Sequence, residues 1–209
     1  MSDSEGDYDE EQEEEEEEAP SGVPRPGMHW HNEPEEWMQQ KTTIAMRCPP
    51  QSDSWRKTGN RKIADSAPFY FLEVLGDFEC RVKIKADFSS PDDQAGIMVR
   101  EDELNWAKCG IQLIGKIPHM CTTVTHDYSD FSMHPIIKLP EFLWVHAKKV
   151  GDGLEVYISD DGFEWVQIRQ GEISKDAMHQ VGLYSASPNS EEGLEVIFED
   201  FMIKDGGGM

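Results

Sequence analysis

A group of polar and aromatic side chains interrupts the apolar stretches of this sequence and could bind a ligand. Arg and Gln can form forked hydrogen bonds with a planar or hydroxylated ligand, and Trp can stack on a sugar ring. Two cations, Arg100 and Lys108, lie within strand-like stretches, where a charge is costly unless it is paired or faces a cleft. We predict that a ligand-binding cleft is formed by Trp55, Arg56, Gln94, Arg100, Trp106, Lys108, Gln112, Ser129 and Asp130.

The same residues could instead hold strand ends together. In that alternative, Trp55 and Trp106 pack in the core. Arg100 then pairs with Asp130, which would satisfy a buried guanidinium without any ligand. The sequence favours the cleft and the structural role about equally.

Glycoside hydrolysis is the first enzyme chemistry to consider. It requires two carboxyl groups about 5–5.5 Å apart for retention or about 6.5–9.5 Å apart for inversion. Residues i and i+2 of a strand share a face and lie about 6.6 Å apart, so an active strand could carry two acids at that spacing. Asp77 and Glu79 lie at a strand start opposite the apolar positions, whereas Glu195 and Glu199 are about 13 Å apart. We predict no catalytic residues, although a pair from neighbouring strands would escape this search.

Candidate metal ligands are few. His119 and Cys121 stand at i and i+2, as do His29 and His31, so each pair could share one face of a strand. Structural zinc sites use paired ligands such as Cys-x-x-Cys, which the sequence lacks. The acidic turn at 127–130 lacks the fuller series of oxygen ligands expected of a calcium site. We predict no metal and no cofactor.

The elements that must position these residues are short strands. Apolar stretches rich in Val, Ile, Phe, Tyr and Trp are bounded by Gly, Pro, Asp and Asn. Residues 78–86 alternate apolar and charged side chains, which indicates one buried and one solvent-facing side. Residues 150–153 and 159–162 place Gly where a hairpin requires positive φ. The predicted strands are 42–46, 67–74, 78–86, 95–100, 107–114, 120–126, 143–150, 154–159, 165–169, 181–185 and 194–204.

A helix is predicted at one place only. Residues 33–40 could form one short helix, capped at Asn32 with Pro34 near its first turn. Many short strands with almost no helix predict an all-β fold, a two-sheet antiparallel β-sandwich.

Charge is concentrated at the N-terminus. The formal net charge is −23, and residues 1–20 hold twelve acidic residues and no basic ones. Such a run repels itself and cannot bury apolar area, so we predict a disordered acidic tail at 1–27, a β-sandwich domain at 28–205 and a flexible C-terminus at 206–209. An acidic surface repels phosphate backbones and anionic lipid, so nucleic acid and membrane are not expected as partners. The tail could steer encounter with a protein partner.

The expected cellular compartment is inferred from the absence of signal-peptide features at the N-terminus. It is acidic where a signal peptide is basic, and no apolar run approaches the length of a transmembrane helix. We expect a cytoplasmic location and leave the nucleus open. In a reducing compartment, Cys48, Cys80, Cys109 and Cys121 are expected to be free buried thiols.

Several motifs combine into a recognisable pattern. They are Trp30-His-Asn-Glu-Pro34, Asp53-Ser-Trp-Arg-Lys-Thr58, Asp93-Gln-Ala-Gly-Ile-Met-Val-Arg100, Trp106-Ala-Lys-Cys-Gly-Ile-Gln112 and Ser129-Asp-Phe-Ser132. Together they resemble the DUF1349 family over roughly residues 28–205. The resemblance implies a concanavalin A-like lectin/glucanase sandwich. The sequence departs from the family at Gln112, where a Glu is usual, and at Phe131, where a Trp is usual.

The polar residues and the resemblance together predict a function. It is a non-catalytic binding module that recognises a carbohydrate or another small polar ligand on the concave sheet face. The alternative is a cytosolic regulatory protein that binds another protein. A glycoside hydrolase is less favoured, because Gln112 puts an amide where the family has an acid, and an amide exchanges no catalytic proton.

Overall fold

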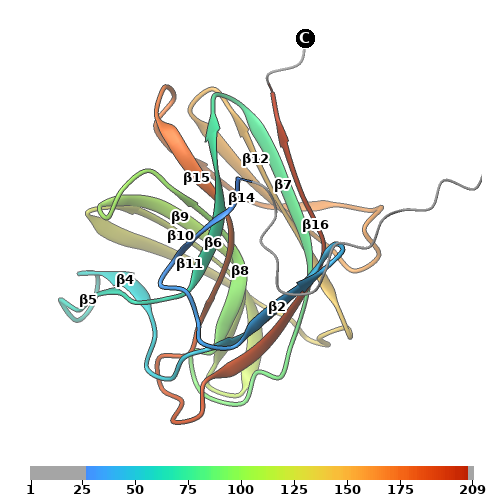
Figure 1. The fold of residues 1–209 in the computed structure, drawn as a ribbon. Coiled ribbons are helices and arrows are strands. Elements are labelled where there is room, and N and C mark those ends of the chain that lie inside the picture. The colour runs from blue at the N-terminus through green and yellow to red at the C-terminus, as the bar shows by residue number, and fades with distance from the viewer. Residues whose placement is uncertain (1–26, 207–209) are drawn as a thin grey trace, which may run out of the picture.

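The computed structural model describes residues 27–206, which form two β-sheets packed face to face (Figure 1). Within that range there are sixteen strands and no helix. The all-β sandwich predicted from the short alternating stretches is therefore confirmed. The predictions of a disordered tail at 1–27 and a flexible C-terminus at 206–209 lie outside the described range, apart from the boundary residues 27 and 206.

Each sheet has seven antiparallel strands. Sheet A runs in the order β1 (His29–His31), β6 (Phe69–Leu75), β15 (Met178–Ala186), β8 (Gln94–Arg100), β9 (Asn105–Ile114), β10 (Ile117–His126) and β11 (Tyr128–Pro135). Sheet B runs in the order β14 (Val166–Glu172), β13 (Gly153–Ser159), β12 (Leu143–Val150), β7 (Phe78–Ala86), β16 (Leu194–Asp205), β3 (Thr43–Cys48) and β2 (Trp37–Gln40). A separate hairpin consists of β4 (Ser54–Arg56) and β5 (Ile63–Asp65), and β4 contacts β11 at the margin of sheet A (Figure 1).

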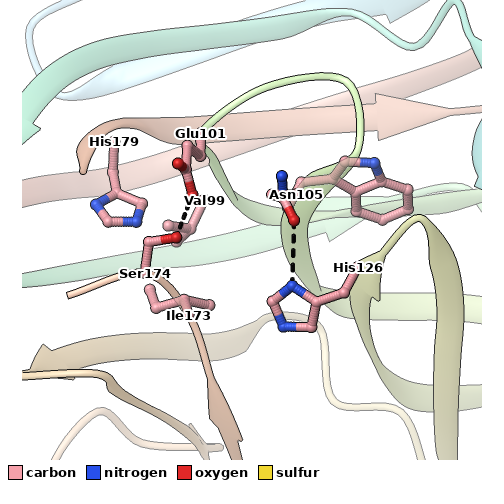
Figure 2. A pocket seen from close by; sticks show the side chains of 8 residues that line it. Val99, Glu101, Asn105, His126, Ile173, Ser174 and His179 are labelled. Atoms are coloured by element: carbon pink, nitrogen blue, oxygen red, sulfur yellow. Dashed lines mark hydrogen bonds between the residues drawn. The ribbon is translucent and has the colours of Figure 1, made fainter. Parts of the chain in front are cut away.

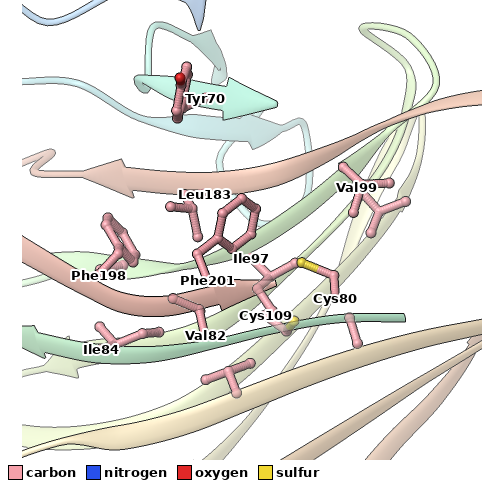
Figure 3. Close-up of a cluster of buried hydrophobic side chains, with 14 of the residues drawn as sticks. Tyr70, Cys80, Val82, Ile84, Ile97, Val99, Cys109, Leu183, Phe198 and Phe201 are labelled. Carbon is pink, nitrogen blue, oxygen red and sulfur yellow. The ribbon is translucent and has the colours of Figure 1, made fainter. Parts of the chain in front are cut away.

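The core lies between the two sheets and follows the predicted alternation. In β7, Cys80, Val82 and Ile84 are buried, while the charged residues between them are not. Figure 3 shows these side chains in one cluster with Ile97 and Val99 of sheet A. The prediction of free buried thiols is also confirmed for Cys48, Cys80, Cys109 and Cys121.

The opposite face of sheet A carries a second, smaller apolar cluster. Because Ile97 and Val99 face the core, their neighbours Met98 and Arg100 point to the outer face. This outer cluster consists of Phe69, Phe71, Met98, Trp106 and Tyr184. These five side chains are at most 7% exposed, so the outer face of sheet A is not an ordinary solvent-facing surface.

The predicted helix at 33–40 is wrong. Residues Trp37–Gln40 form strand β2, which pairs with β3, Trp37 lying opposite Met46. Trp37 also packs edge-on against Trp30 at 5.1 Å and contacts the ring of Tyr70 at 5.6 Å. Ring packing and strand pairing outweigh the local capping signal, because tertiary contacts override a weak helix preference.

Several strands that the sequence analysis did not predict are short or lie at sheet edges. They are β1, β2, β4, β5 and β11, and β1, β2 and β11 each end a sheet. Edge strands need no continuous apolar stretch, since only one side of them is paired. Strand β11 illustrates this, because each of its residues after Ser129 is either exposed or intermediate in burial.

Candidate ligand-binding site

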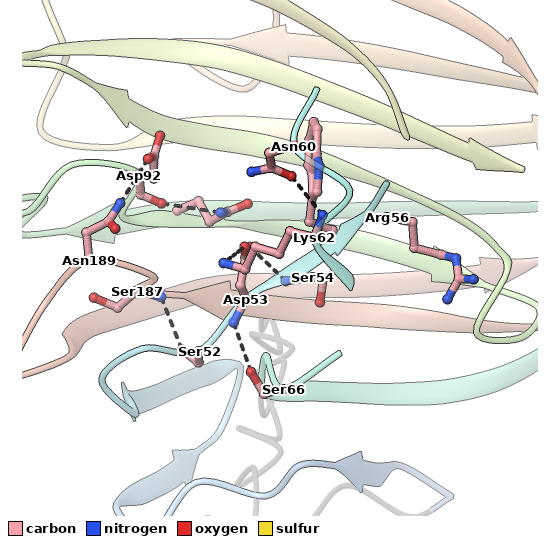
Figure 4. Close-up of polar contacts among 12 residues, drawn as sticks. Ser52, Asp53, Ser54, Arg56, Asn60, Lys62, Ser66, Asp92, Ser187 and Asn189 are labelled. Atoms are coloured by element: carbon pink, nitrogen blue, oxygen red, sulfur yellow. Dashed lines mark hydrogen bonds and ion pairs between the residues drawn. The ribbon is translucent and has the colours of Figure 1, made fainter. Parts of the chain in front are cut away.

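A pocket of about 320 Å³ opens on the outer face of sheet A, beside the β4–β5 hairpin. The hairpin supplies one wall, strands β8, β9 and β11 supply the floor, and the loops at 91–93 and 187–190 supply the far side (Figure 4). Its lining residues are Asp53, Trp55, Asn60, Lys62, Asp92, Gln94, Lys108, Gln112, Phe131, Pro188 and Asn189.

The hairpin is held over sheet A at both of its ends. On the β11 side, Arg56 N donates to Ser129 Oγ at 3.0 Å, and Arg56 Nη2 donates to Asp127 Oδ1 at 2.9 Å. On the β15 side, Ser187 N donates to Ser52 Oγ at 3.1 Å. These bonds fix the wall of the pocket relative to its floor.

Lys108 is a buried cation in the floor of the pocket. Only 4% of the residue is exposed, and Nζ donates to the carbonyl oxygen of Ser54 at 2.7 Å and to Gln94 Oε1 at 2.8 Å. Burial lowers the pKa of Lys108 to about 8, an effect that the negative charge of Asp53 partly offsets. The ammonium therefore links the hairpin to strand β8 and still lines the pocket.

Two carboxylates line the same pocket. Asp53 Oδ2 accepts from Lys62 Nζ at 2.9 Å. The two oxygens of Asp92 accept from Gln112 Nε2 and Asn189 Nδ2, each at 3.0 Å. A search for acids along single strands could not find this pair, because neither residue lies in a strand of sheet A.

Several polar side chains that line the pocket retain unused hydrogen-bonding capacity. The side chains of Gln112 and Asn189 donate to Asp92 through nitrogen, and each amide has a carbonyl oxygen left as an acceptor. Asn60 Oδ1 accepts from Lys62 N at 2.9 Å, so its amide nitrogen is left as a donor. Donors and acceptors that line the same cavity match a ligand that carries several hydroxyl groups, since each hydroxyl can both donate and accept.

An aromatic wall completes the pocket. Trp55 is half-buried, its Nε1 donates to the carbonyl oxygen of Thr58 at 2.9 Å, and its ring meets that of Phe131 edge-on at 5.9 Å. The hydrogen bond fixes the orientation of the indole. A fixed, partly exposed indole beside polar groups is suited to stacking on the apolar face of a ring.

The structure brings together part of the residue set predicted from the sequence. Trp55, Gln94, Lys108 and Gln112 all line the pocket. The lining residues that the sequence analysis did not select are mostly in the turn before β4, in the hairpin loop and in the loops flanking β8 and β15: Asp53, Asn60, Lys62, Asp92, Phe131, Pro188 and Asn189. Asp53 and Phe131 lie inside the quoted motifs, so membership in a motif was the sequence signal that could have identified them as lining residues.

The remaining predicted residues lie outside the pocket lining. Trp106 packs in the outer cluster, as its structural alternative expected, and Arg56 and Ser129 hold the hairpin in place. Asp130 Oδ2 accepts from Arg169 Nη2 at 2.9 Å. The alternative in which Arg100 pairs with Asp130 is therefore wrong.

Arg100 pairs instead with Asp65 on strand β5. Its Nη1 and Nη2 donate to Oδ1 and Oδ2 at 2.7 and 2.8 Å, a two-bonded contact between sheet A and the hairpin. The Arg100 side chain is 9% exposed and that of Asp65 is 37% exposed. The carboxylate that binds the Arg100 guanidinium therefore lies on β5, a strand that the sequence analysis did not predict.

Replacing Arg100 with methionine is expected to lower the free energy of unfolding by about 2 kcal/mol, because two charge-assisted hydrogen bonds at a largely buried site are lost. The matched control is Arg169→Met, which removes a single bond to Asp130, a side chain that is 69% exposed. That control should cost less than about 1 kcal/mol. Urea denaturation of both variants measures the two losses in free energy of unfolding. Equal losses would contradict the inference that the Arg100–Asp65 pair stabilises the protein more than the Arg169–Asp130 pair does.

A second, much smaller pocket lies at the opposite end of sheet A (Figure 2). Its volume of about 10 Å³ suits a water-sized occupant only. His179 is 1% exposed there, and both of its ring nitrogens lack a hydrogen-bond partner in the described part of the chain. Burial lowers the pKa of His179, and the charge of Lys149 lowers it further. This pocket is too small for a sugar-sized ligand.

Between residues 27 and 206 no three His, Cys, Asp or Glu side chains form a group that could hold a metal ion. In the same range no helix is long and apolar enough to cross a membrane.

Comparison with known proteins settles the family. The model of the family described as "Protein of unknown function (DUF1349)" matches residues 30–205. The chain belongs to this family. The match covers both sheets and the β4–β5 hairpin, so the resemblance inferred from the motifs is confirmed.

This DUF1349 protein is similar to yeast relatives in sequence and to a bacterial module in fold alone. "Regulation of enolase protein 1" of Saccharomyces cerevisiae is 26% identical over 174 residues, which cover 83% of this chain and 87% of the relative. A crystal structure of a functionally unknown protein from S. cerevisiae is 25% identical with a TM-score of 0.82, covering 87% of this chain and 98% of that one. The carbohydrate-binding module CBM66 of Bacillus subtilis is 12% identical with a TM-score of 0.57, covering 86% of this chain and 96% of that one. The last match shows a shared jelly-roll fold alone.

Proposed function

We propose that this DUF1349 protein is a non-catalytic binding protein whose pocket on the outer face of sheet A takes a carbohydrate or a similarly hydroxylated small molecule. The observation that carries the proposal is the lining itself. A buried ammonium, two carboxylates and several side-chain amides surround one cavity that also has an indole wall.

The chemistry of the lining favours a polyhydroxylated ligand over an ion. Lys108 and Lys62 contribute two positive charges, and Asp53 and Asp92 contribute two negative charges, so the ionised lining is close to neutral. A neutral lining offers no net attraction to a charged ligand, but it offers many directed donors and acceptors. Trp55 then provides the apolar contact that a sugar ring needs.

The relatives support the proposal to different degrees. The B. subtilis module shares the fold and is by its description a carbohydrate-binding module, which supports a carbohydrate ligand by analogy of fold only. The name of the S. cerevisiae relative refers to regulation, which agrees with a role without catalysis. Neither identifies the ligand of this chain.

A glycan array followed by isothermal titration calorimetry tests the proposal. Asp92→Ala and Gln112→Leu are expected to weaken binding of the best glycan at least about tenfold, or about 1.4 kcal/mol, because each removes hydrogen bonds to hydroxyls. Glu141→Gln is the matched control, since Glu141 is exposed and does not line the pocket. Its carboxylate pairs with Lys85 at an N–O distance of 2.8 Å. Binding that is unchanged in both pocket variants, or absent for every glycan, would overturn the proposal.

The name of the yeast relative favours a second candidate function, a regulatory protein that binds another protein. In this candidate the twelve acidic residues within 1–20 steer encounter with a basic partner, so the association rate falls as salt rises. Pull-downs with the whole chain and with a chain lacking residues 1–27 test it. The same partners at the same salt sensitivity would show that the segment has no such role.

A further inference from the structure

The amine of Lys108 lines the pocket, and its nitrogen could act as a nucleophile as well as a hydrogen-bond donor. We propose that Lys108 forms an imine with small aldehydes that enter the pocket, in particular hydroxyaldehydes and the open-chain form of aldoses. This inference rests on the proposed function in one respect only, that a hydroxylated molecule enters this pocket.

The geometry separates Lys108 from an ordinary lysine. It is 4% exposed, and in the described range no carboxylate oxygen lies within 4.0 Å of its Nζ. Its hydrogen-bond partners are two uncharged acceptors, the Ser54 carbonyl oxygen and Gln94 Oε1. A buried amine without an acid beside it loses hydration and gains no close counter-charge, which is the environment of nucleophilic lysines.

The hydrogen bonds also fit the uncharged amine. A neutral amine has two N–H donors and one lone pair, and the two acceptors at 2.7 and 2.8 Å occupy both donors. The lone pair then takes the remaining position on nitrogen. Burial lowers the pKa of Lys108 to about 8, so roughly a tenth of the amine is neutral at pH 7, compared with well under a thousandth for a lysine of ordinary pKa.

The reaction balances without any further reagent. The neutral amine attacks the carbonyl carbon of the aldehyde, and a C–N bond forms as the carbonyl π bond opens to a carbinolamine. Loss of the hydroxyl with one nitrogen-bound proton expels water and leaves a carbon–nitrogen double bond. The net change is an aldehyde and an amine converted to an imine and water, and hydrolysis reverses it.

Two other lysines serve as internal controls. Lys62 lines the same pocket, but its amine has a close carboxylate partner, Asp53, at 2.9 Å. Lys149 is equally buried, at 1% exposed, but it lies outside this pocket, and its Nζ donates to the carbonyl oxygens of Gly76 and Lys175. Access to the pocket and the absence of a close acid therefore coincide only at Lys108 among these three.

The test is reductive trapping in the intact full-length protein. The protein is incubated with glycolaldehyde and sodium cyanoborohydride at pH 7, and the modification of each lysine is followed by peptide mass spectrometry. Lys108 is expected to be modified at least about tenfold faster than Lys62, Lys149 and the average surface lysine, because of its larger neutral fraction. In 8 M urea this advantage should disappear, and Lys108→Arg should abolish the fast phase.

Modification of Lys108 at or below the rate of the other lysines would overturn the inference. If that occurred while calorimetry still showed glycan binding, the proposed function would stand and only the imine would fail. If Lys108 reacted fast but a methyl glycoside at saturating concentration did not slow it, the reactive amine would stand and the proposed glycan site would fail.

Discussion

Replacing Gly96 or Gly110 with alanine is expected to destabilise the protein by about 3–5 kcal/mol, enough to leave much of it unfolded at 37 °C. The two glycines lie opposite each other in strands β8 and β9. A Cβ at Gly96 would lie 1.9 Å from the carbonyl oxygen of Cys109, and a Cβ at Gly110 would lie 2.1 Å from that of Ala95. Both obstacles are backbone atoms of the paired strand, so a side-chain rotation cannot relieve the overlap.

Thermal and urea denaturation measure this effect, with Gly153→Ala as the matched control. A Cβ at Gly153 would lie 3.4 Å from the nearest backbone oxygen, which is an ordinary contact. The free energy of unfolding of this variant should therefore be within about 1 kcal/mol of the wild-type value. Wild-type stability in Gly96→Ala would contradict the close approach of β8 and β9. The close approach bears on function, because both strands supply the floor of the pocket.

Raising the pH above 9 is expected to unfold the protein by ionising the four cysteines in the unfolded chain. Burial raises the pKa of Cys48 to about 11 and those of Cys109 and Cys121 to about 12, from an ordinary 9.0, and it also raises the pKa of Cys80 well above that ordinary value. These raised values mean that the native state keeps its thiol protons where the unfolded state has lost them. The resulting stability is therefore complete below pH 9 and is lost progressively between pH 9 and about 12.

The expected loss is about 2–3 kcal/mol for each of Cys48, Cys109 and Cys121 between pH 9 and 11, and their sum lies within the stability range of a typical domain. Lys108 acts in the opposite direction, because its lowered pKa returns about 3 kcal/mol at most as the pH rises from 8 to 10.5. Urea midpoints at pH 8, 9.5 and 10.5, under reducing conditions, give the slope. The slope should become shallower in Cys109→Ala, and a flat profile in wild type would contradict the burial of the thiols.

Much of the fold could be predicted because alternation reports directly on which side of a strand is buried. The predicted bounds of β7 and β12 agree with the structure to the residue, since both are central strands with one apolar face. Positive φ at Gly151 and Gly162 likewise confirms the predicted hairpin turns. Strand β2 was predicted as helix because its local sequence carries a capping signal, whereas the contact of Trp37 with Trp30 and Tyr70 is not local.

The site was harder to predict, because it is assembled across strands and loops. Gln94, Lys108 and Gln112 could be found as polar residues embedded in strands, where burial of a polar group needs a reason. Asp92 and Asn189 could not, since they are loop residues that meet only when the 91–93 and 187–190 loops come together. The pairing of Arg100 with Asp65 depends in turn on the position of the hairpin, which no local pattern encodes.

The most direct test of the central claim is a protein-detected NMR titration with the glycan that binds best in the array. The side-chain amides of Gln94, Gln112 and Asn189 and the indole N–H of Trp55 all belong to the pocket, so their signals report on its occupation. Saturable shifts concentrated on these groups, with one dissociation constant in common, are the predicted result. Shifts confined to sheet B or to the small pocket at His179, or no shifts with any glycan, would contradict a ligand site on the outer face of sheet A.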